Sequence, residues 1–422
     1  MVKKDRLYDY ALEPVPLDKR RSFYSTVTVW GGWVISITAF LVGGLVGGGL
    51  PLNKAIPAIL IGNTVLFAIA SLLGTIGMKT GLSSTLISRA IFGKYGAIVL
   101  SIVIGIIGMG FVGVFAGAVG EFFQSFDLPF ALGAIVFMIA VTTTAILGFR
   151  GLSYLSWIAV PLLLILAVIG LFKVGGTIPG GLSAVSSMTP KGTMPFTTGV
   201  TLAIATWITG TFLCPDIGRY AKNKWHVIAG AFVGWIVGAA FLETVSAMMA
   251  LGVGSGNIVE VMIGIGLTVP AVIIFFGAMW TTADNNLYSF SLAFTNICGI
   301  LNARQLKKHI WVIIGSITAL ILALAGIYGE FKTFLLQLAT FVPPIAGVYL
   351  GEYYMLMKYK LEGEELNKQI FEAKSININA FIAWGIGSAV AYFYKGGIPA
   401  IQGLLVAMIV YFVLEKTVQT RN

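Results

Sequence analysis

Charged residues are scarce in this chain. Asp, Glu, Lys and Arg make up only 10% of its 422 residues, whereas an average soluble domain has roughly 25%. Hydrophobic residues make up 57%, and many of them form runs long enough to cross a bilayer. Glycine, by contrast, is abundant, with 52 residues, and small residues let helices approach closely in lipid. This composition excludes an ordinary soluble domain and predicts an all-α polytopic membrane protein.

Cysteine and histidine are also scarce, with two of each. Cys214 and Cys298 lie within or at the edge of apolar runs, and their spacing is not typical of a metal site or a disulfide framework. His226 and His309 are far apart and lie at loop edges. With no Ser/His/Asp set either, we expect no enzyme. The formal charge of +10 is spread over short segments between the apolar runs, so we expect no nucleic acid partner.

Apolar runs of about 17 to 25 residues each predict a transmembrane helix. Counting them predicts 12 transmembrane helices, which we number as spans in chain order. The predicted spans are 24–49, 56–74, 97–123, 130–148, 155–172, 198–218, 227–250, 268–297, 310–327, 333–350, 378–394 and 398–414.

The basic residues indicate the orientation of these spans. If the N-terminus is cytoplasmic, nearly all of the 27 Lys and Arg residues fall in cytoplasmic segments, as the positive-inside rule requires. The exceptions are Lys54, Lys173, Lys191, Lys332 and Lys395. We therefore expect a multi-pass protein of the cell (cytoplasmic) membrane, with both termini cytoplasmic and no cleavable signal before the first span.

One long charged linker, 351–377, separates ten spans from a final pair, and we expect a short amphipathic helix within it. Ten spans divide into five and five. Because five is odd, the two halves would have opposite orientations in the membrane, as in inverted-repeat transporters. The predicted organisation is a cytoplasmic segment 1–23, a first repeat 24–172, a second repeat 198–350, the linker 351–377, spans eleven and twelve at 378–414, and a tail 415–422.

The first and sixth spans occupy equivalent positions in such halves, and both contain helix-breaking residues. The first contains Trp30-Gly31-Gly32-Trp33 and later glycine pairs, and the sixth contains the segment 207–211 before Pro215. Unwound backbone is tolerated in a membrane where it lines a cavity, and there it offers carbonyls and amides to ligands. We therefore expect both helices to be discontinuous. The alternative is that the glycines only permit close helix packing.

A polar string, WTTADNN at 280–286, lies inside the apolar eighth span. Burying such groups costs several kcal/mol unless they find partners, so they usually face a bundle interior, an ion or a substrate. Thr281 and Thr282 offer adjacent hydroxyls, and the Ala278 carbonyl lies one turn earlier.

The carbonyls of Gly32 and Ile35 in the first span would complete a sodium site of hard oxygen ligands. The alternative is that both threonines bond back to carbonyls of their own helix. Glu121 and Glu243 also lie in or near apolar spans, and either would suit a proton-coupled transporter.

Two segments resemble the nucleobase:cation symporter (purine/cytosine permease) family. They are SLLGTIGMKTGLSSTLISRAIFG at 71–93 and MWTTADNNLY at 279–288. The resemblance implies a 5+5 inverted-repeat sodium-symporter fold with discontinuous first and sixth helices. By matching position it implies a sodium ion between the first and eighth spans. Its ligands would be the carbonyls of Gly32, Ile35 and Ala278 and the hydroxyls of Thr281 and Thr282, with Ser36 as an alternative to Ile35.

The resemblance also implies a substrate lying flat between Phe111 of the third span and Trp207 of the sixth, with Thr209 bonding its edge. Gly108 stands where cytosine permease has a glutamine. Because glycine offers only space and backbone, a ring other than cytosine is plausible. Asn285 is a further candidate for an edge contact. Asp284 is a candidate too, although a structural bond would also explain it.

The function that follows is sodium-coupled symport of a nucleobase or similar planar nitrogen heterocycle by alternating access. The partners would be that heterocycle, sodium and the lipid bilayer. The alternatives are proton-coupled transport of a related ring such as a hydantoin, allantoin, hydroxymethylpyrimidine or creatinine, and a channel or a membrane enzyme.

Overall fold

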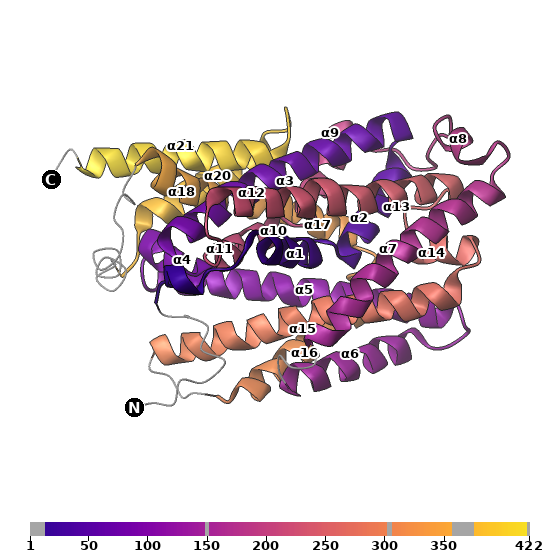
Figure 1. Ribbon diagram of the computed structural model, residues 1–422, viewed down its shortest axis with the longest axis horizontal. Helices are drawn as coiled ribbons and strands as arrows, with labels where there is room; N and C mark the ends of the chain where they lie inside the picture. The colour runs from indigo at the N-terminus through magenta and orange to yellow at the C-terminus, as the bar shows by residue number, and fades with distance from the viewer. Residues whose placement is uncertain (1–12, 148–151, 302–305, 357–374, 420–422) are drawn as a thin grey trace.

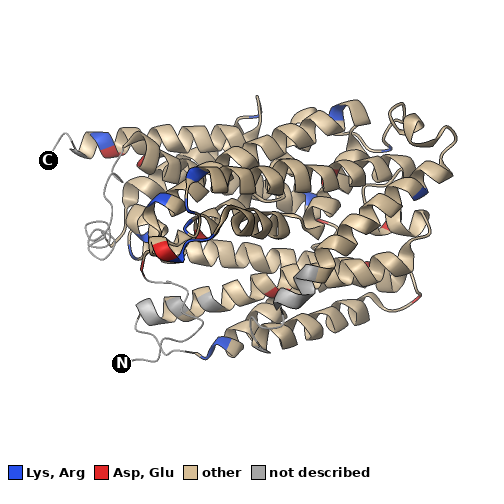
Figure 2. Cartoon of the chain, viewed as in Figure 1, with Lys and Arg blue, Asp and Glu red and all other residues tan. Residues whose placement is uncertain are grey.

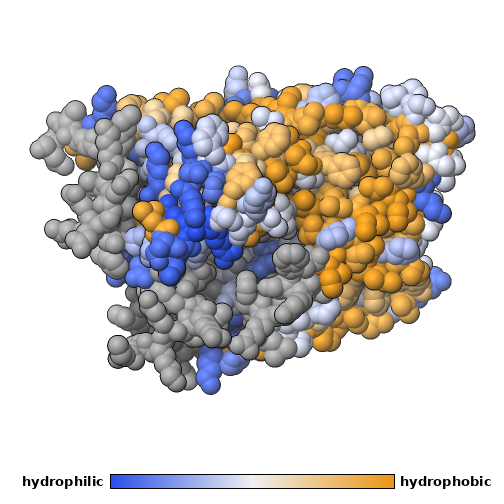
Figure 3. Space-filling view, in the orientation of Figure 1, coloured by the Kyte–Doolittle hydropathy of each residue, from blue (hydrophilic) through white to orange (hydrophobic). Residues whose placement is uncertain are grey.

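The protein is a bundle of helices that run largely along one axis (Figure 1). A computed structural model describes residues 13–147, 152–301, 306–356 and 375–419. Lys, Arg, Asp and Glu gather toward the two ends of the bundle (Figure 2). On the face drawn in Figure 3, the coloured surface between those ends is broadly hydrophobic. This pattern is typical of a bundle that crosses a bilayer.

The helices are short where the chain breaks and long where an apolar run is continuous. In chain order they are η1 (Leu17–Lys19), α1 (Phe23–Val34), α2 (Ile37–Gly49), α3 (Leu52–Thr80), α4 (Ser84–Phe92), α5 (Gly96–Gln124), α6 (Phe130–Leu147), α7 (Leu152–Thr177), α8 (Gly181–Val185), α9 (Phe196–Ala205), α10 (Ile208–Thr211), α11 (Cys214–Gly218), α12 (Lys224–Ala231), η2 (Phe232–Ala239), α13 (Ala240–Val253), α14 (Ile258–Gly264), α15 (Thr268–Ile300), α16 (Lys308–Leu324), α17 (Phe331–Phe341), α18 (Pro343–Leu350), η3 (Gly351–Met355), α20 (Ile378–Phe393) and α21 (Pro399–Gln419).

Helices occupy each of the twelve predicted spans. Within the described residues, six helices are by themselves long and apolar enough to cross a membrane, or seven if α1 and α2 count as one bent span. α6, α9, α16 and α20 are shorter apolar helices, and α15 carries the polar string. The all-α architecture is therefore confirmed.

The first span is broken as predicted, but not at its glycines. α1 ends at Val34 and α2 begins at Ile37, with a bend of 51° between them. Ser36 at the break has φ −140° and ψ 163°, an extended conformation that any residue adopts. Gly31 and Gly32 lie inside α1. The break therefore needs no glycine, and it lies just beyond the glycine pair.

The later glycines of the first span serve close packing. A Cβ added to Gly43 would lie 2.2 Å from the Glu243 carbonyl oxygen, and one added to Gly47 would lie 2.2 Å from the Ala247 carbonyl oxygen. Both distances are far below a van der Waals contact, so only glycine fits against the backbone of α13. The close-packing alternative is correct for these two positions.

The sixth span is discontinuous, as predicted. It consists of α9, α10 and α11, and Trp207 between α9 and α10 has φ −131° and ψ 7°.

In the seventh span a π-helical segment, η2, joins α12 to α13. The tenth span bends at Val342, before Pro343, and continues through η3 to Met355. The amphipathic helix predicted in the linker falls largely at 357–374, outside the described residues.

Candidate functional site

The break in the sixth span presents an aromatic ring and two polar atoms that have no partner. Trp207 packs edge-on against Trp33 of α1, with ring centroids 5.0 Å apart. Trp207 Nε1 and Thr209 Oγ1 are both buried and have no hydrogen-bond partner among the described residues. Buried polar atoms are nearly always bonded, so an unpaired one at a helix break indicates a ligand or strain. Trp33 belongs to the glycine-containing segment 30–33 noted in the sequence, but it was not predicted as a site residue.

The third span places Phe111 in a second aromatic group. The Phe111 ring contacts Phe334 of α17 at 5.2 Å and Phe331 at 6.5 Å between centroids. Phe111 and Trp207 are both partly exposed, and the described part of the chain shows no direct contact between the two rings. Each ring is thus supported by another aromatic side chain on a different helix, and Phe334 is a second residue that was not predicted as a site residue.

Two threonines of the polar string converge on one carbonyl. Thr281 Oγ1 and Thr282 Oγ1 donate to the Ala278 carbonyl oxygen at 3.0 and 3.1 Å. This is the bond back to the helix that the alternative predicted. The same geometry places two of the five predicted sodium ligands within hydrogen-bond distance of a third, the Ala278 carbonyl.

The first span supplies carbonyls near its break. The last bond of α1 runs from the Ile35 amide to the Gly31 carbonyl at 3.0 Å. Because the last carbonyls of a helix have no intrahelical partner, those from Gly32 onward are available to a ligand. Ser36 Oγ is buried and has no partner among the described residues. Neutral oxygens from an unwound helix suit sodium, so the residues present fit that ion.

α2 and α15 pack together beside these groups. Phe40 of α2 contacts Phe275 of α15, with ring centroids 5.4 Å apart. Phe40 follows the break of the first span by about one turn, and Phe275 precedes Ala278 by about one turn. The contact therefore holds the two predicted halves of the sodium site on neighbouring helices.

The rest of the polar string divides between two faces of α15. Asp284 is 2% exposed and lies near Thr144 of α6 and Lys308 of α16, and its Oδ1 has no hydrogen-bond partner among the described residues. Asn285 is exposed, and its amide donates to the Thr281 carbonyl at 3.1 Å.

Asn286, rather than Asn285, lies against the third span. A Cβ on Gly108 would be 3.4 Å from Asn286 Oδ1. Asn286 was not predicted as a site residue, although it lies one helical turn after Thr282 and on the same face. Its amide occupies the region beside Gly108 where a longer side chain of the third span would lie.

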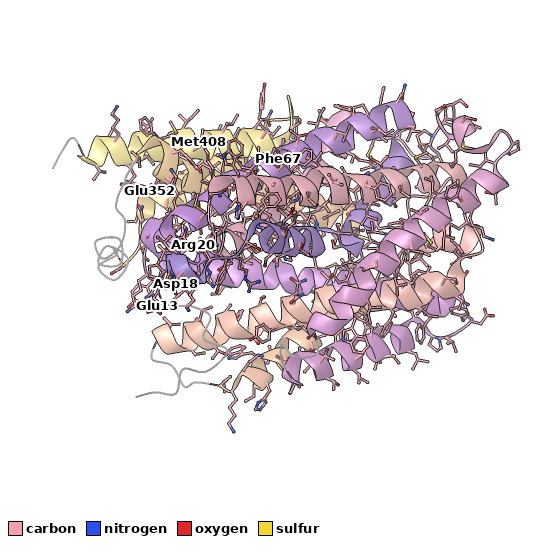
Figure 4. All side chains as sticks on the ribbon, viewed as in Figure 1. Glu13, Asp18, Arg20, Phe67, Glu352 and Met408 are labelled. Carbon is pink, nitrogen blue, oxygen red and sulfur yellow. The ribbon has the colours of Figure 1, made fainter. Side chains whose placement is uncertain are left out.

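One end of the bundle is closed around the segment before α1. Arg20 Nη1 donates to the Met78 carbonyl at 2.7 Å, and the Arg21 amide donates to the Tyr220 carbonyl at 2.7 Å. Burial lowers the pKa of the Arg20 guanidinium from its ordinary value, but an arginine stays charged. Figure 4 shows Arg20 and Asp18 toward the end of the bundle where Glu352 also lies. These bonds join the segment to the ends of the second and sixth spans.

The family relationship covers nearly the whole chain. Residues 14–414 match a family described as permease for cytosine/purines, uracil, thiamine, allantoin. The cytosine permease of Escherichia coli strain K12 is 30% identical over 420 residues, which cover 98% of this chain and 96% of that protein.

Solved structures share the fold. Mhp1, described as a nucleobase-cation-symport-1 family transporter in a closed conformation with bromovinylhydantoin bound, matches with a TM-score of 0.79 at 18% identity, covering 97% of this chain and 96% of that one. A Na⁺-coupled sialic acid symporter matches with a TM-score of 0.68 at 11% identity, covering 98% and 93%. The chain therefore has the sodium-symporter fold and belongs to the cytosine/purine permease family of nucleobase:cation symporters, a family of multi-pass membrane transporters.

Proposed function

We propose that the protein is a sodium-coupled symporter of a planar nitrogen heterocycle that works by alternating access. One observation carries the substrate assignment: at the break of the sixth span, Trp207 Nε1 and Thr209 Oγ1 are buried and have no partner in the part of the chain that the structure describes. A planar ring with nitrogen and oxygen at its edge would stack on the Trp207 face and bond these atoms. The relatives named cytosine permease and the bromovinylhydantoin bound to Mhp1 support this substrate class.

Sodium is the ion that the oxygens on the first and eighth spans suit best. The proposed ligands are the carbonyls of Gly32, Ile35 and Ala278 and the hydroxyls of Thr281 and Thr282. The ion would hold the broken first span against α15. The fold shared with a Na⁺-coupled symporter supports this choice.

The proposed location is the cytoplasmic membrane, with both termini in the cytoplasm. The distribution of Lys and Arg along the sequence supports this orientation. In that orientation the bonds of Arg20 and Arg21 close the cytoplasmic side. Opening of that side would require these bonds to break, and they are therefore part of the proposed inner gate.

A thermal-shift screen of the purified protein tests the proposal. The compounds are cytosine, purines, hydantoins, hydroxymethylpyrimidine, allantoin and creatinine, each in sodium chloride and in choline chloride. We expect one heterocycle to raise Tm, and to raise it more in sodium, because linkage requires each ligand to tighten the other by the same factor.

The screen can also contradict the proposal. A heterocycle that stabilises the protein equally in sodium and choline would exclude sodium coupling but keep the substrate class. If none of these rings shifts Tm in either salt, the substrate class is wrong.

Asn286 is proposed as the side chain that contacts the substrate edge beside Gly108. Asn286→Ala should weaken substrate binding by about 2- to 10-fold, the worth of one neutral hydrogen bond. Isothermal titration calorimetry with the heterocycle found in the screen measures this change.

Asn285→Ala is a matched comparison, because both amides donate to the carbonyl four residues earlier at 3.1 Å. If Asn285→Ala weakens binding and Asn286→Ala does not, the edge contact belongs to Asn285 instead.

A further inference from the structure

A carboxylic acid lies fully buried beside the break of the sixth span. Glu243 of α13 is 0% exposed. Asn63 of α3 donates from Nδ2 to Glu243 Oε2 at 2.7 Å, and Thr206 Oγ1 lies 2.9 Å from Glu243 Oε1. Asn63 is also 0% exposed, and Thr206 is 4% exposed. Three helical spans, the second, sixth and seventh, therefore meet at this carboxyl group.

Two further contacts extend this network to backbone carbonyls. Asn63 Nδ2 donates to the Ile59 carbonyl at 3.0 Å, and Thr206 Oγ1 lies 3.2 Å from the Leu202 carbonyl. The Ile59 carbonyl can only accept a hydrogen bond, and this fixes the amide nitrogen of Asn63 on that side. The network thus contains four short polar contacts.

The number of hydrogens in the network indicates the protonation state of Glu243. The Asn63 amide supplies two hydrogens, and the Thr206 hydroxyl supplies one. Four contacts need four hydrogens, so one contact stays unfilled if Glu243 is ionised. If Glu243 carries a proton on Oε1, that proton is donated to Thr206 Oγ1, and the Thr206 hydroxyl is donated to the Leu202 carbonyl. Every contact is then satisfied.

The elements packed around Glu243 supply no nearby positive charge. α2, α8, α9 and η2 contain no ionisable residue. The ionisable residues of α3, Lys54 and Lys79, are exposed and lie about 13 Å and about 24 Å along the helix from Asn63. Lys173 is the ionisable residue among the described side chains of α7, and it is exposed. In α14, Glu260 is bonded to Ser255. An ionised Glu243 would be a buried charge without a counter-ion, which is strongly unfavourable.

We propose that Glu243 is a proton-binding site and that its proton holds the sixth-span break in the substrate-binding arrangement. Thr206 is the residue that receives the proton's hydrogen bond, and it directly precedes Trp207. Loss of the proton leaves the Thr206 hydroxyl shared between the Leu202 carbonyl and a carboxylate. That change alters the hydrogen bonding of Thr206, and it thereby shifts the backbone that carries the Trp207 ring. The inference rests on the proposed substrate site at Trp207, and it adds a proton to the ligands of that site.

The test is the pH dependence of substrate affinity, measured by calorimetry in sodium from about pH 6 to about pH 9. Wild-type affinity should be constant at the acid end and fall by about tenfold per pH unit at the alkaline end, because one proton is linked to binding. Glu243→Gln should keep the acid-end affinity at every pH, since the amide donates to Thr206 and accepts from Asn63 as the protonated acid does.

Glu121→Gln is the matched control. Glu121 is a second carboxylic acid of the spans and accepts a hydrogen bond from Asn257 at 2.7 Å. Among the described residues, no hydrogen bond links it to the sixth-span break. The Glu121→Gln variant should show the same pH dependence of substrate affinity as the wild type. A wild-type affinity that is flat over the whole range would overturn the proposal, and so would a Glu243→Gln variant that is folded and retains the wild-type pH dependence or has lost substrate binding.

A second measurement does not depend on substrate or on folding of the Glu243→Gln variant. The infrared carbonyl band of a protonated carboxylic acid should be present at neutral pH both in the wild-type protein and in Glu121→Gln, and it should weaken as the pH rises. The absence of any such band from wild-type protein at neutral pH would overturn the proposal. If no heterocycle binds but the band titrates, the proposed function has failed and the proton site stands.

Discussion

Replacing Thr282 by alanine is expected to weaken sodium-dependent substrate binding by about 10- to 100-fold without unfolding the protein. The substitution removes one of five proposed oxygen ligands, and a bond to a charged partner contributes about 1.5–3 kcal/mol. Among the described residues, the Thr282 hydroxyl bonds only to the Ala278 carbonyl of its own helix, so the fold loses little. Calorimetric titration of the heterocycle at a series of sodium concentrations measures the effect.

Two companion variants separate the sodium site from a general effect of removing a hydroxyl. Thr282→Ser keeps the oxygen and should retain wild-type sodium dependence. Thr318→Ala removes an exposed threonine that bonds back to the Ile314 carbonyl of α16 at 2.9 Å, and it should change nothing. An unaltered sodium dependence in Thr282→Ala would mean that the ion, if it binds, does so elsewhere.

Replacing Trp207 by alanine is expected to reduce substrate affinity by about 10- to 100-fold at every sodium concentration. Stacking on one aromatic face contributes about 1–3 kcal/mol, and the substitution also removes the unpaired Nε1 donor. Trp207→Phe keeps a ring face but not the donor, so its loss of affinity should be smaller. The measurement is the dissociation constant of the heterocycle, together with Tm to verify folding.

Trp225→Ala serves as the control for loss of a tryptophan. Its side chain is 64% exposed at the start of α12, and it is not one of the proposed site residues. It should bind substrate as the wild type does. Equal binding by Trp207→Ala and wild type would remove Trp207 from the substrate site, whatever the outcome for sodium.

The hydropathy of the sequence was sufficient to predict where the helices lie. Each of the twelve predicted spans contains helix, because a backbone in lipid must satisfy its hydrogen bonds internally. The position of a break is less predictable. Glycine was the expected signal in the first span, yet the chain departs from the helix at Ile35 and Ser36 in an extended conformation, which leaves no mark in composition.

The candidate site, too, could be predicted only in part from the sequence. The polar string at 280–286 could be recognised from sequence because polar residues are costly in an apolar span. Its division into faces could not. The structure places Asn286 against Gly108 and Asp284 near Thr144 and Lys308, and such contacts depend on how α15 is rotated against α5, α6 and α16.

By itself, the sequence determined that this is a helical membrane protein, roughly where its spans begin and end, and which family it resembles. These properties follow from the residues of each segment and their order. Only the tertiary structure decided which polar atoms stay unpaired at the breaks, and that Glu243 meets Asn63 and Thr206. Those three residues are separated by up to 180 positions. Their contact depends on the packing of three spans, which no local pattern encodes.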